Sequence, residues 1–460
     1  MRRAWGLIRE SLAGEQRDYT SGPIRHAILM LAIPMVLELC LESVFAVVDV
    51  FFVSRLGADA VATVALTESM LVIIYAVAMG LSMGATAIVA RRIGEKNHDG
   101  AARAAVQAIL LGLFIAVPVG LFGALYARPL LEVMGATHGV TANASYTTVM
   151  LGANGVIMML FLINAVFRGA GDATIAMRVL WIANAVNICL DPCFIFGLGP
   201  FPRLGVTGAS VATTTGRSIG VAVQLYFLAR RDGRVAVRPE HIRFDSGVML
   251  NMARLSGSAV VQGLIPNLSW LGLVRILATF GSAALAGYAI AFRVVVFALL
   301  PAWGLANAAA TLVGQNLGAG KPDRAETSVW QACIYNMVFL GVVGFVFVVL
   351  PVALVAAFTD DPGVAEHAVH ALRIISAGFP FYAYAMVLTQ AFNGAGDTVT
   401  PTIINLFCFW LWELPIAYAL SHAAGLGPSG VFWSIAIAYS TMALVSVVWF
   451  RRGRWKLKKV

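Results

Sequence analysis

The sequence predicts an all-α polytopic membrane protein whose twelve transmembrane helices form two pseudo-symmetric six-helix lobes around a central cavity. Three observations support this fold class. The chain is 60% hydrophobic and 12% charged, whereas soluble domains contain roughly 25% charged residues. It contains twelve apolar runs that reach the ~20 residues needed to cross a bilayer. Several motifs of the first half also return in the second half at a nearly constant offset.

The apolar runs follow one another in order and end at polar or glycine-rich segments such as SRLGAD, RRIGEKNHDG and RGAGD. The runs of the first half are 26–53, 60–90, 104–125, 142–167, 174–197 and 206–228. Those of the second half are 255–279, 284–313, 328–350, 366–392, 400–421 and 428–450. The predicted domains are an N-terminal arm (1–25), an N-lobe (26–228), an inter-lobe loop (229–250), a C-lobe (251–450) and a basic tail (451–460).

Basic residues gather outside these runs, mainly in the arm, the inter-lobe loop and the tail RRGRWKLKK. The loops predicted on the opposite side contain or adjoin only Arg55, Arg128, Arg203 and Arg373. Because Lys and Arg are enriched in cytoplasmic loops, both termini are predicted in the cytoplasm of a multi-pass inner-membrane protein. Contacts with anionic lipid then explain the net charge of +9, so no nucleic-acid partner is expected.

An internal repeat relates the two halves. SRLGADAVATVALTE from Ser54 matches ATFGSAALAGYAIAF from Ala278, and RRIGEKNHDGAARA from Arg91 matches QNLGAGKPDRAETS from Gln315. FRGAGD at 167–172 returns as FNGAGD at 392–397. Parallel repeats of six helices are typical of transporters with two lobes. Asp172 and Asp397, at the ends of the repeated motif, are expected to cap the helices that follow.

These motifs together resemble the multidrug and toxic compound extrusion (MATE) family over residues 20–450. The most specific marks are VDVFFVSRLG, the two F-x-G-A-G-D loops, GQNLGAGKPDRA, and NICLDP followed by GVTGASVAT. The resemblance implies an antiporter, not an enzyme, that exports amphipathic and often cationic drugs by alternating access. Its coupling ion would be H+ or Na+, with no other cofactor, and the chain is expected to be a monomer in contact with membrane lipid.

The pattern is similar to the DinF-like branch of that family, whose ion site lies in the N-lobe. The resemblance places this site at Asp49 of the first run, Asn187 and Asp191 of the fifth, and Thr213 of the sixth. The NorM-like branch instead relies on acids of the seventh and tenth helices. The matching positions here are Gln262 and Tyr382, which departs from that pattern.

The residues themselves also indicate an ion pathway in the N-lobe. Glu38, Glu42 and Asp49 are spaced by 4 and 7 residues, so they share one helical face. An ionised acid at the bilayer centre costs ~2.5–3.5 kcal/mol on insertion scales, which disfavours a purely structural role for several of them. Burial and the mutual repulsion of neighbouring carboxylates both disfavour the ionised form of these acids, so they are expected to exchange protons. The further candidates for a proton or substrate path are Glu68, Gln262, Tyr382 and Glu413.

An oxygen-rich set around the fifth run favours a small cation such as Na+. Asn187 and Asp191 are one turn apart, and Pro192 loosens the helix beside them. Ala209 can offer a carbonyl and Thr213 a hydroxyl from one face of the sixth run. Pro34 gives the first helix a place to bend.

Two alternatives remain open. Asp191 would have a structural role if it pairs with Arg217 or bonds a neighbouring helix. A lipid-linked precursor flippase of the same superfamily is the main functional alternative, although buried arginines are few.

The five cysteines lie in apolar runs without metal-ligand spacing and are expected to be buried thiols.

Overall fold

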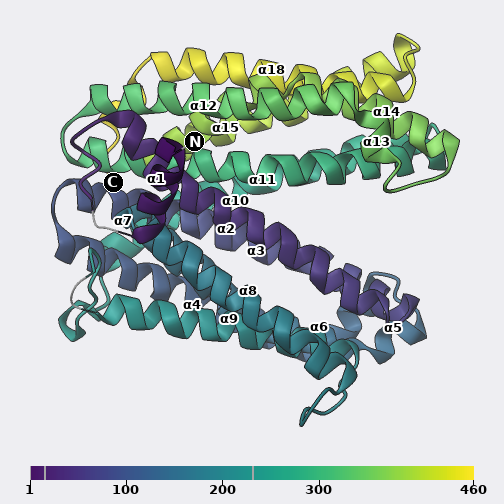
Figure 1. The fold of residues 1–460 in the computed structure, drawn as a ribbon, viewed down its shortest axis with the longest axis horizontal. Coiled ribbons are helices and arrows are strands. Elements are labelled where there is room, and N and C mark those ends of the chain that lie inside the picture. The colour runs from purple at the N-terminus through teal and green to yellow at the C-terminus, as the bar shows by residue number, and fades with distance from the viewer. Residues whose placement is uncertain (1, 15–16, 231–232) are drawn as a thin grey trace. The chain divides into compact units, whose positions relative to one another are not determined.

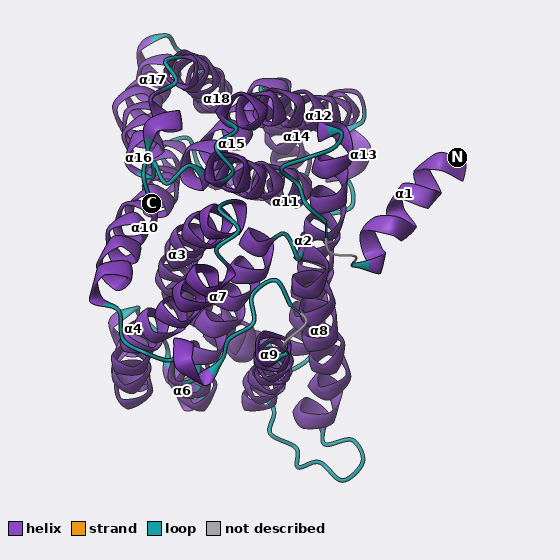
Figure 2. Cartoon of the chain, turned by 90° about the vertical axis from the view of Figure 1, so that its left-hand side faces the viewer, coloured by secondary structure: helices purple, strands orange, loops and turns teal. Residues whose placement is uncertain are grey.

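The computed structural model describes residues 2–14, 17–230 and 233–460. Every regular element within these ranges is helical, as Figure 2 shows, which confirms the predicted all-α class. The elements of the first half are α1 (Arg2–Ala13), α2 (Ile24–Ser54), α3 (Ala58–Gly94), α4 (His98–Val133), α5 (His138–Ala142), α6 (Ala144–Gly152), α7 (Asn154–Ala170), α8 (Ala173–Phe196), α9 (Val206–Ala229) and the 3₁₀ turn η1 (Pro239–His241).

The second half has the same kind of elements. They are α10 (Ser246–Ala278), α11 (Ser282–Gly318), α12 (Pro322–Val349), α13 (Pro351–Val355), α14 (Pro362–Ala377), α15 (Phe379–Gly394), α16 (Val399–Asn405), the π-helix η2 (Leu406–Glu413), α17 (Leu414–Tyr418), the π-helix η3 (Ala419–Ala423), α18 (Pro428–Arg451) and the 3₁₀ turn η4 (Arg454–Leu457).

The described helices provide the twelve predicted membrane passes. Eight passes are long and apolar enough to cross a membrane as they stand, and two bent helix pairs raise the number to ten. α2, with 31 residues, and α9, with 24, are the other two. The bent pairs are α6–α7, at 41°, and α14–α15, at 56°. They are the fourth and tenth passes, so the internal repeat extends to the bend itself.

The chain divides into two compact units. The first contains Met1–Asp18 and Leu37–Gly257, and the second contains Tyr19–Val36 and Ser258–Val460. In the first unit α8 lies beside α9, and in the second α11 lies beside α12, as Figure 1 shows. The division runs through α2, two residues beyond Pro34.

Glycines allow close helix contacts at matching places in the two units. A Cβ added to Gly208 of α9 would overlap the carbonyl of Phe194 in α8. A Cβ added to Gly430 of α18 would overlap the backbone of Ser421 in η3. Small residues at helix interfaces let backbones approach closely in membranes. The GVTGASVAT motif therefore contributes to packing as well as to the site described below.

The first GAGD loop joins α7 to α8. Gly171 has a φ of 87°, in the left-handed region that glycine adopts without strain. The prediction that Asp172 caps α8 is wrong, because its side chain makes no capping hydrogen bond. The Asp172 carboxylate lies instead 3.7 Å from Arg234 Nε. Burial raises the pKa of Asp172 to about 6, and the Arg234 guanidinium opposes this shift.

The basic tail contacts the second GAGD loop in a similar way. Lys458 Nζ lies 3.2 Å from Asp397 Oδ1. Asp397 also accepts a hydrogen bond from the backbone N–H of Thr400, in the first turn of α16, at 3.4 Å, although the N-cap position of that helix is Thr398. Lys456 Nζ lies 2.6 Å from Glu326 Oε2, and this hydrogen bond raises the pKa of the lysine. In each unit, a basic residue beyond the last long helix thus faces the aspartate of the GAGD loop.

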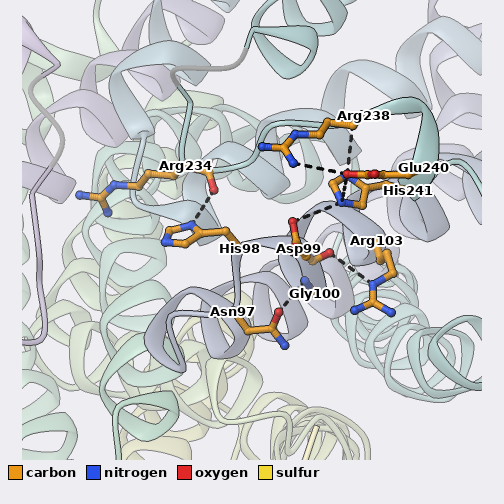
Figure 3. Close-up of polar contacts among 9 residues, drawn as sticks. All are labelled: Asn97, His98, Asp99, Gly100, Arg103, Arg234, Arg238, Glu240 and His241. Atoms are coloured by element: carbon orange, nitrogen blue, oxygen red, sulfur yellow. Dashed lines mark hydrogen bonds and ion pairs between the residues drawn. The ribbon is translucent and has the colours of Figure 1, made fainter.

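The segment after α9 is attached to the start of α4, as Figure 3 shows. His98 Nδ1 lies 3.0 Å from the carbonyl oxygen of Arg234, and His241 Nε2 lies 3.3 Å from Asp99 Oδ1. Asn97 caps α4 by accepting a hydrogen bond from the third residue after it. The inter-lobe loop is therefore anchored to the first unit through polar contacts of its own residues.

The cysteines only partly follow the expectation of buried thiols. Cys333 and Cys408 are buried, and Cys40 and Cys193 are half-buried. The expectation is wrong for Cys189, which is exposed. Cys189 lies two residues from both Asn187 and Asp191, so it points away from the helix face that those two residues bury.

Gly394 provides a test of this packing. A Cβ on Gly394 of α15 would overlap the backbone of Ala310 in α11, so Gly394→Ala is expected to destabilise the protein by about 1–3 kcal/mol. A Cβ on Gly341 of α12 would meet nothing within 4 Å, so Gly341→Ala is the matched control. The midpoint of thermal unfolding in detergent is measured for both variants. Equal midpoints for the two variants would contradict this account of the α11–α15 contact.

Candidate functional site

The acidic face predicted for the first pass lies on α2, and Glu38 begins it. Glu38 is 3% exposed. Its Oε1 accepts hydrogen bonds from Arg168 Nη1 at 2.8 Å and from Asn164 Nδ2 at 3.2 Å, both on α7. Oε2 is buried and has no hydrogen-bond partner among the described residues. This carboxyl therefore belongs to a buried ion pair between α2 and α7.

Glu42, one turn further along α2, faces α8 and α9. Its Oε2 accepts a hydrogen bond from Asn184 Nδ2 at 3.1 Å, and its Oε1 lies 3.9 Å from Arg217 Nη2. Arg217 is 7% exposed and also donates to the Tyr75 hydroxyl at 3.2 Å. Arg217 thus places a buried positive charge beside the acidic face of α2.

Asp191, Asn187 and Thr213 lie together, as the sequence predicts. Asp191 has no exposed surface, and the other two are also buried. With the Asn187 amide oriented to suit its neighbours, its nitrogen donates to Asp191 Oδ2 at 2.8 Å and its oxygen accepts from Thr213 Oγ1 at 2.9 Å. The amide therefore links the carboxylate of α8 to the hydroxyl of α9. Ala209 is buried on α9 one turn before Thr213.

Asp49 connects the α2 acids with this set. Its carboxylate lies within electrostatic range of Asp191, and also of Glu68 on α3 and of Arg217. Oδ1 of Asp49 is buried without a hydrogen-bond partner among the described residues. An unpartnered carboxylate oxygen within electrostatic range of Asp191 can bind a proton or act as a ligand of a small cation.

The alternative pairing of Asp191 with Arg217 receives no support from these contacts. Arg217 interacts with Glu42, Tyr75 and Glu68, whereas Asp191 hydrogen-bonds Asn187. Both prolines predicted to loosen helices lie inside continuous ones, Pro34 in α2 and Pro192 in α8. A bend of α2 at Pro34 stays a prediction.

The remaining candidates lie in the second unit and are not part of this set. Gln262 of α10 is buried, and its side-chain oxygen has no hydrogen-bond partner among the described residues. Tyr382 of α15 stacks on Tyr439 of α18 with ring centres 3.9 Å apart. Glu413 is buried at the end of η2 and contacts Ser269 of α10.

Sequence reasoning missed several members of the first-unit site. Asn164, Arg168 and Asn184 contact the acids of α2, but each lies more than a hundred residues away along the chain. The sequence signal that could have identified these three residues is that each is a polar side chain inside a predicted membrane span. Such residues are rare in spans and usually face other helices.

The chemistry of the site is that of oxygen donors and carboxylates. No group of three or more His, Cys, Asp or Glu side chains in the described part of the chain has the geometry of a metal centre. The Asp191 set combines one carboxylate, one amide oxygen and one hydroxyl, with Asp49 nearby. Hard cations prefer oxygen ligands of this kind, and a pair of interacting carboxyls can share a proton.

Comparison with known proteins agrees with a transport role. The family model MatE matches residues 34–193 and 259–419. The chain is 27% identical to the probable multidrug resistance protein NorM of Thermotoga maritima, over 95% of this chain and 94% of that one. It is 25% identical to a protein named FAD transporter from Shewanella oneidensis, over 90% and 91%. The multidrug export protein MepA of Staphylococcus aureus is 23% identical over 95% and 96%.

Solved structures show the same similarity. A MOP superfamily transporter from Pyrococcus furiosus superposes with a TM-score of 0.89 at 25% identity, over 97% of this chain and all of that one. An outward-facing multidrug resistance transporter of the MATE family, also in the MOP superfamily, gives the same values.

Proposed function

This chain belongs to the MatE family, and we propose that it exports amphipathic, often cationic organic compounds in exchange for H+ or Na+ by alternating access. Members of the family are transporters, not enzymes, and named relatives are multidrug exporters. The multi-pass helical fold agrees with a membrane location. The proposal includes the inner membrane, both termini in the cytoplasm and a monomeric chain.

The observation that carries the proposal is the buried set of Asp191, Asn187 and Thr213 with Asp49 beside it. A carboxylate at membrane depth is costly unless it is neutralised, and the hydrogen-bond partner of Asp191 is the neutral amide of Asn187. A coupling ion would supply the missing charge. Na+ would use the oxygen donors directly, and a proton would occupy one of the two carboxyls.

The energy available from such an ion is sufficient for export. One charge that moves down a potential of ~150 mV releases about 3.5 kcal/mol, at about 2.3 kcal/mol per 100 mV. Each tenfold step in concentration requires about 1.4 kcal/mol. One ion per neutral substrate thus supports a gradient of a few hundred-fold, and a substrate with one positive charge requires a second ion for the same gradient.

A lipid-linked precursor flippase is the alternative. Such a protein would need cationic side chains to hold a pyrophosphate group. The two arginines near the α2 acids face glutamates, since Arg168 contacts Glu38 and Arg217 lies near Glu42. Their charges are therefore already matched, which favours an exporter of small organic compounds.

Substrate uptake into inverted vesicles tests the proposal, with ethidium or norfloxacin as substrate and sodium and pH varied separately. We expect uptake to collapse when the gradient of the coupling ion is dissipated and to persist when only the other gradient is removed. Vesicles without the protein give the background. Uptake that survives the loss of both gradients would contradict ion coupling.

A further inference from the structure

Glu413 of the second unit lies outside the proposed ion set, and its position is unusual for an acid in a membrane pass. It is the last residue of η2, an eight-residue π-helix. π-helices are rare and are found mostly as single-turn bulges at functional sites. The Glu413 side chain is 3% exposed. A carboxyl buried there requires a counter-charge, a bound cation or a proton.

The contacts of Ser269 in α10 indicate whether Glu413 is neutralised by a counter-charge, a cation or a proton. Ser269 Oγ lies 2.8 Å from the carbonyl oxygen of Phe409 and 2.9 Å from Glu413 Oε2. A serine hydroxyl has one proton to donate and two lone pairs that accept. A carbonyl can only accept. Both contacts can therefore be hydrogen bonds at the same time only if the hydroxyl proton goes to Phe409 and Glu413 Oε2 carries a proton that it donates to Ser269.

The other groups that face Glu413 agree with a neutral carboxyl. Its hydrogen-bond partner is Ser269, and no basic side chain contributes to its electrostatics in the described part of the chain. The titratable side chains that interact with it are Tyr288 of α11, Tyr382 of α15, Tyr439 of α18 and Cys408 of η2. Tyrosine and cysteine are ordinarily neutral at pH 7. An ionised Glu413 would therefore be buried without a partner cation.

Loss of the proton would change the contact between α10 and η2. The Ser269 hydroxyl would turn to the carboxylate, because charged acceptors form stronger hydrogen bonds, and the Phe409 carbonyl would lose the hydrogen bond from Ser269. A neighbouring contact between the same helices involves no titratable group. Trp410 Nε1 donates to the carbonyl of Ile265 at 3.2 Å. Glu413 thus makes one contact of this helix pair dependent on a proton.

We propose that Glu413 is a proton-binding site of the second unit, occupied in this conformation and emptied when Ser269 turns its hydroxyl to the carboxylate. The site shares no residue with the Asp191 set, which belongs to the first unit. Its use during transport rests on the proposed function, whereas the protonation itself does not.

Infrared spectroscopy of the reconstituted protein tests the protonation directly. At pH 7 we expect the C=O stretching band of a protonated carboxyl, and Glu413→Gln should remove the intensity of one carboxyl from it. The glutamine amide can donate to Ser269 as the protonated acid does, so this variant should fold. Ser269→Ala should shift the band, because the carboxyl loses its hydrogen bond. Glu132→Gln, at an exposed position, is the control and should leave the band unchanged.

An identical band in the wild type and in Glu413→Gln would overturn the proposal. Vesicle transport then tests the role of the site. Glu413→Gln cannot release a proton, so we expect export to slow at least tenfold while binding of ethidium is retained. Export at the wild-type rate would overturn the role in transport. If the wild type itself moves no substrate under any gradient, the proposed function fails, but the infrared result still decides the state of Glu413.

Discussion

Asp191→Asn is expected to reduce export of ethidium or norfloxacin to the level of vesicles that lack the protein. Asparagine has the same shape and still accepts a hydrogen bond from Asn187, so the helix pair α8–α9 should remain folded. It cannot hold a proton on a carboxylate, and it removes the negative charge that a sodium ion would neutralise. The coupling ion would then have no site linking it to substrate movement.

The comparison variants separate a loss of ion coupling from a loss of folding or expression. Asp360→Asn makes the same chemical change at an exposed loop position and should leave export unchanged. Asn187→Ala and Thr213→Ala each remove one partner of the set and should lower export about tenfold, for a loss of about 1.4 kcal/mol. Protein levels and unfolding midpoints must stay near those of the wild type.

Two outcomes would contradict the assignment of the coupling site to the Asp191 set. Export by Asp191→Asn above background would show that its carboxyl is not required. A larger effect of Gln262→Ala than of Asp49→Asn would place the coupling ion in the second unit. In that case the resemblance to the DinF-like branch would have identified the wrong half of the chain.

The sequence was informative wherever the determining interactions are local. The length of an apolar run sets the length of a membrane pass, so most predicted helices agree with the observed ones within several residues. Asn187 and Asp191 share a face because they are one turn apart, which needs no knowledge of the tertiary structure. The bends between α6 and α7 and between α14 and α15 were not predicted. No proline marks the break at Ala153, and Pro380, in the first turn of α15 just after Gly378, was not used as a signal of a break.

Contacts between distant residues explain the predictions that failed. Asp172 does not cap α8, because Arg234 reaches it from beyond α9. Similarly, no local pattern shows that Glu38 faces Arg168 or that Ser269 joins Glu413 to the backbone of Phe409. A polar residue in an apolar run signals that some partner exists. Which partner it is depends on how the helices pack.

The second large effect is expected at the buried ion pair between Glu38 and Arg168. Arg168→Met removes the shortest hydrogen bond of Glu38 and leaves a buried carboxylate without its cation. Removal of one partner from a buried pair typically costs about 3–5 kcal/mol, so the unfolding midpoint should fall sharply. The double variant with Glu38→Gln removes both charges and should recover most of the loss.

A surface pair of the same chemistry is the control for this experiment. Arg128 Nε lies 3.2 Å from Glu132 Oε1, and both side chains are more than half exposed, at 63% and 55%. Arg128→Met should therefore change the stability by less than about 1 kcal/mol. If Arg168→Met is as stable as Arg128→Met, the α2–α7 pair has no structural role. If the double variant recovers stability but not export, the pair is needed to hold the acidic face of α2 in its working position, because Glu42 and Asp49 lie on the same helix.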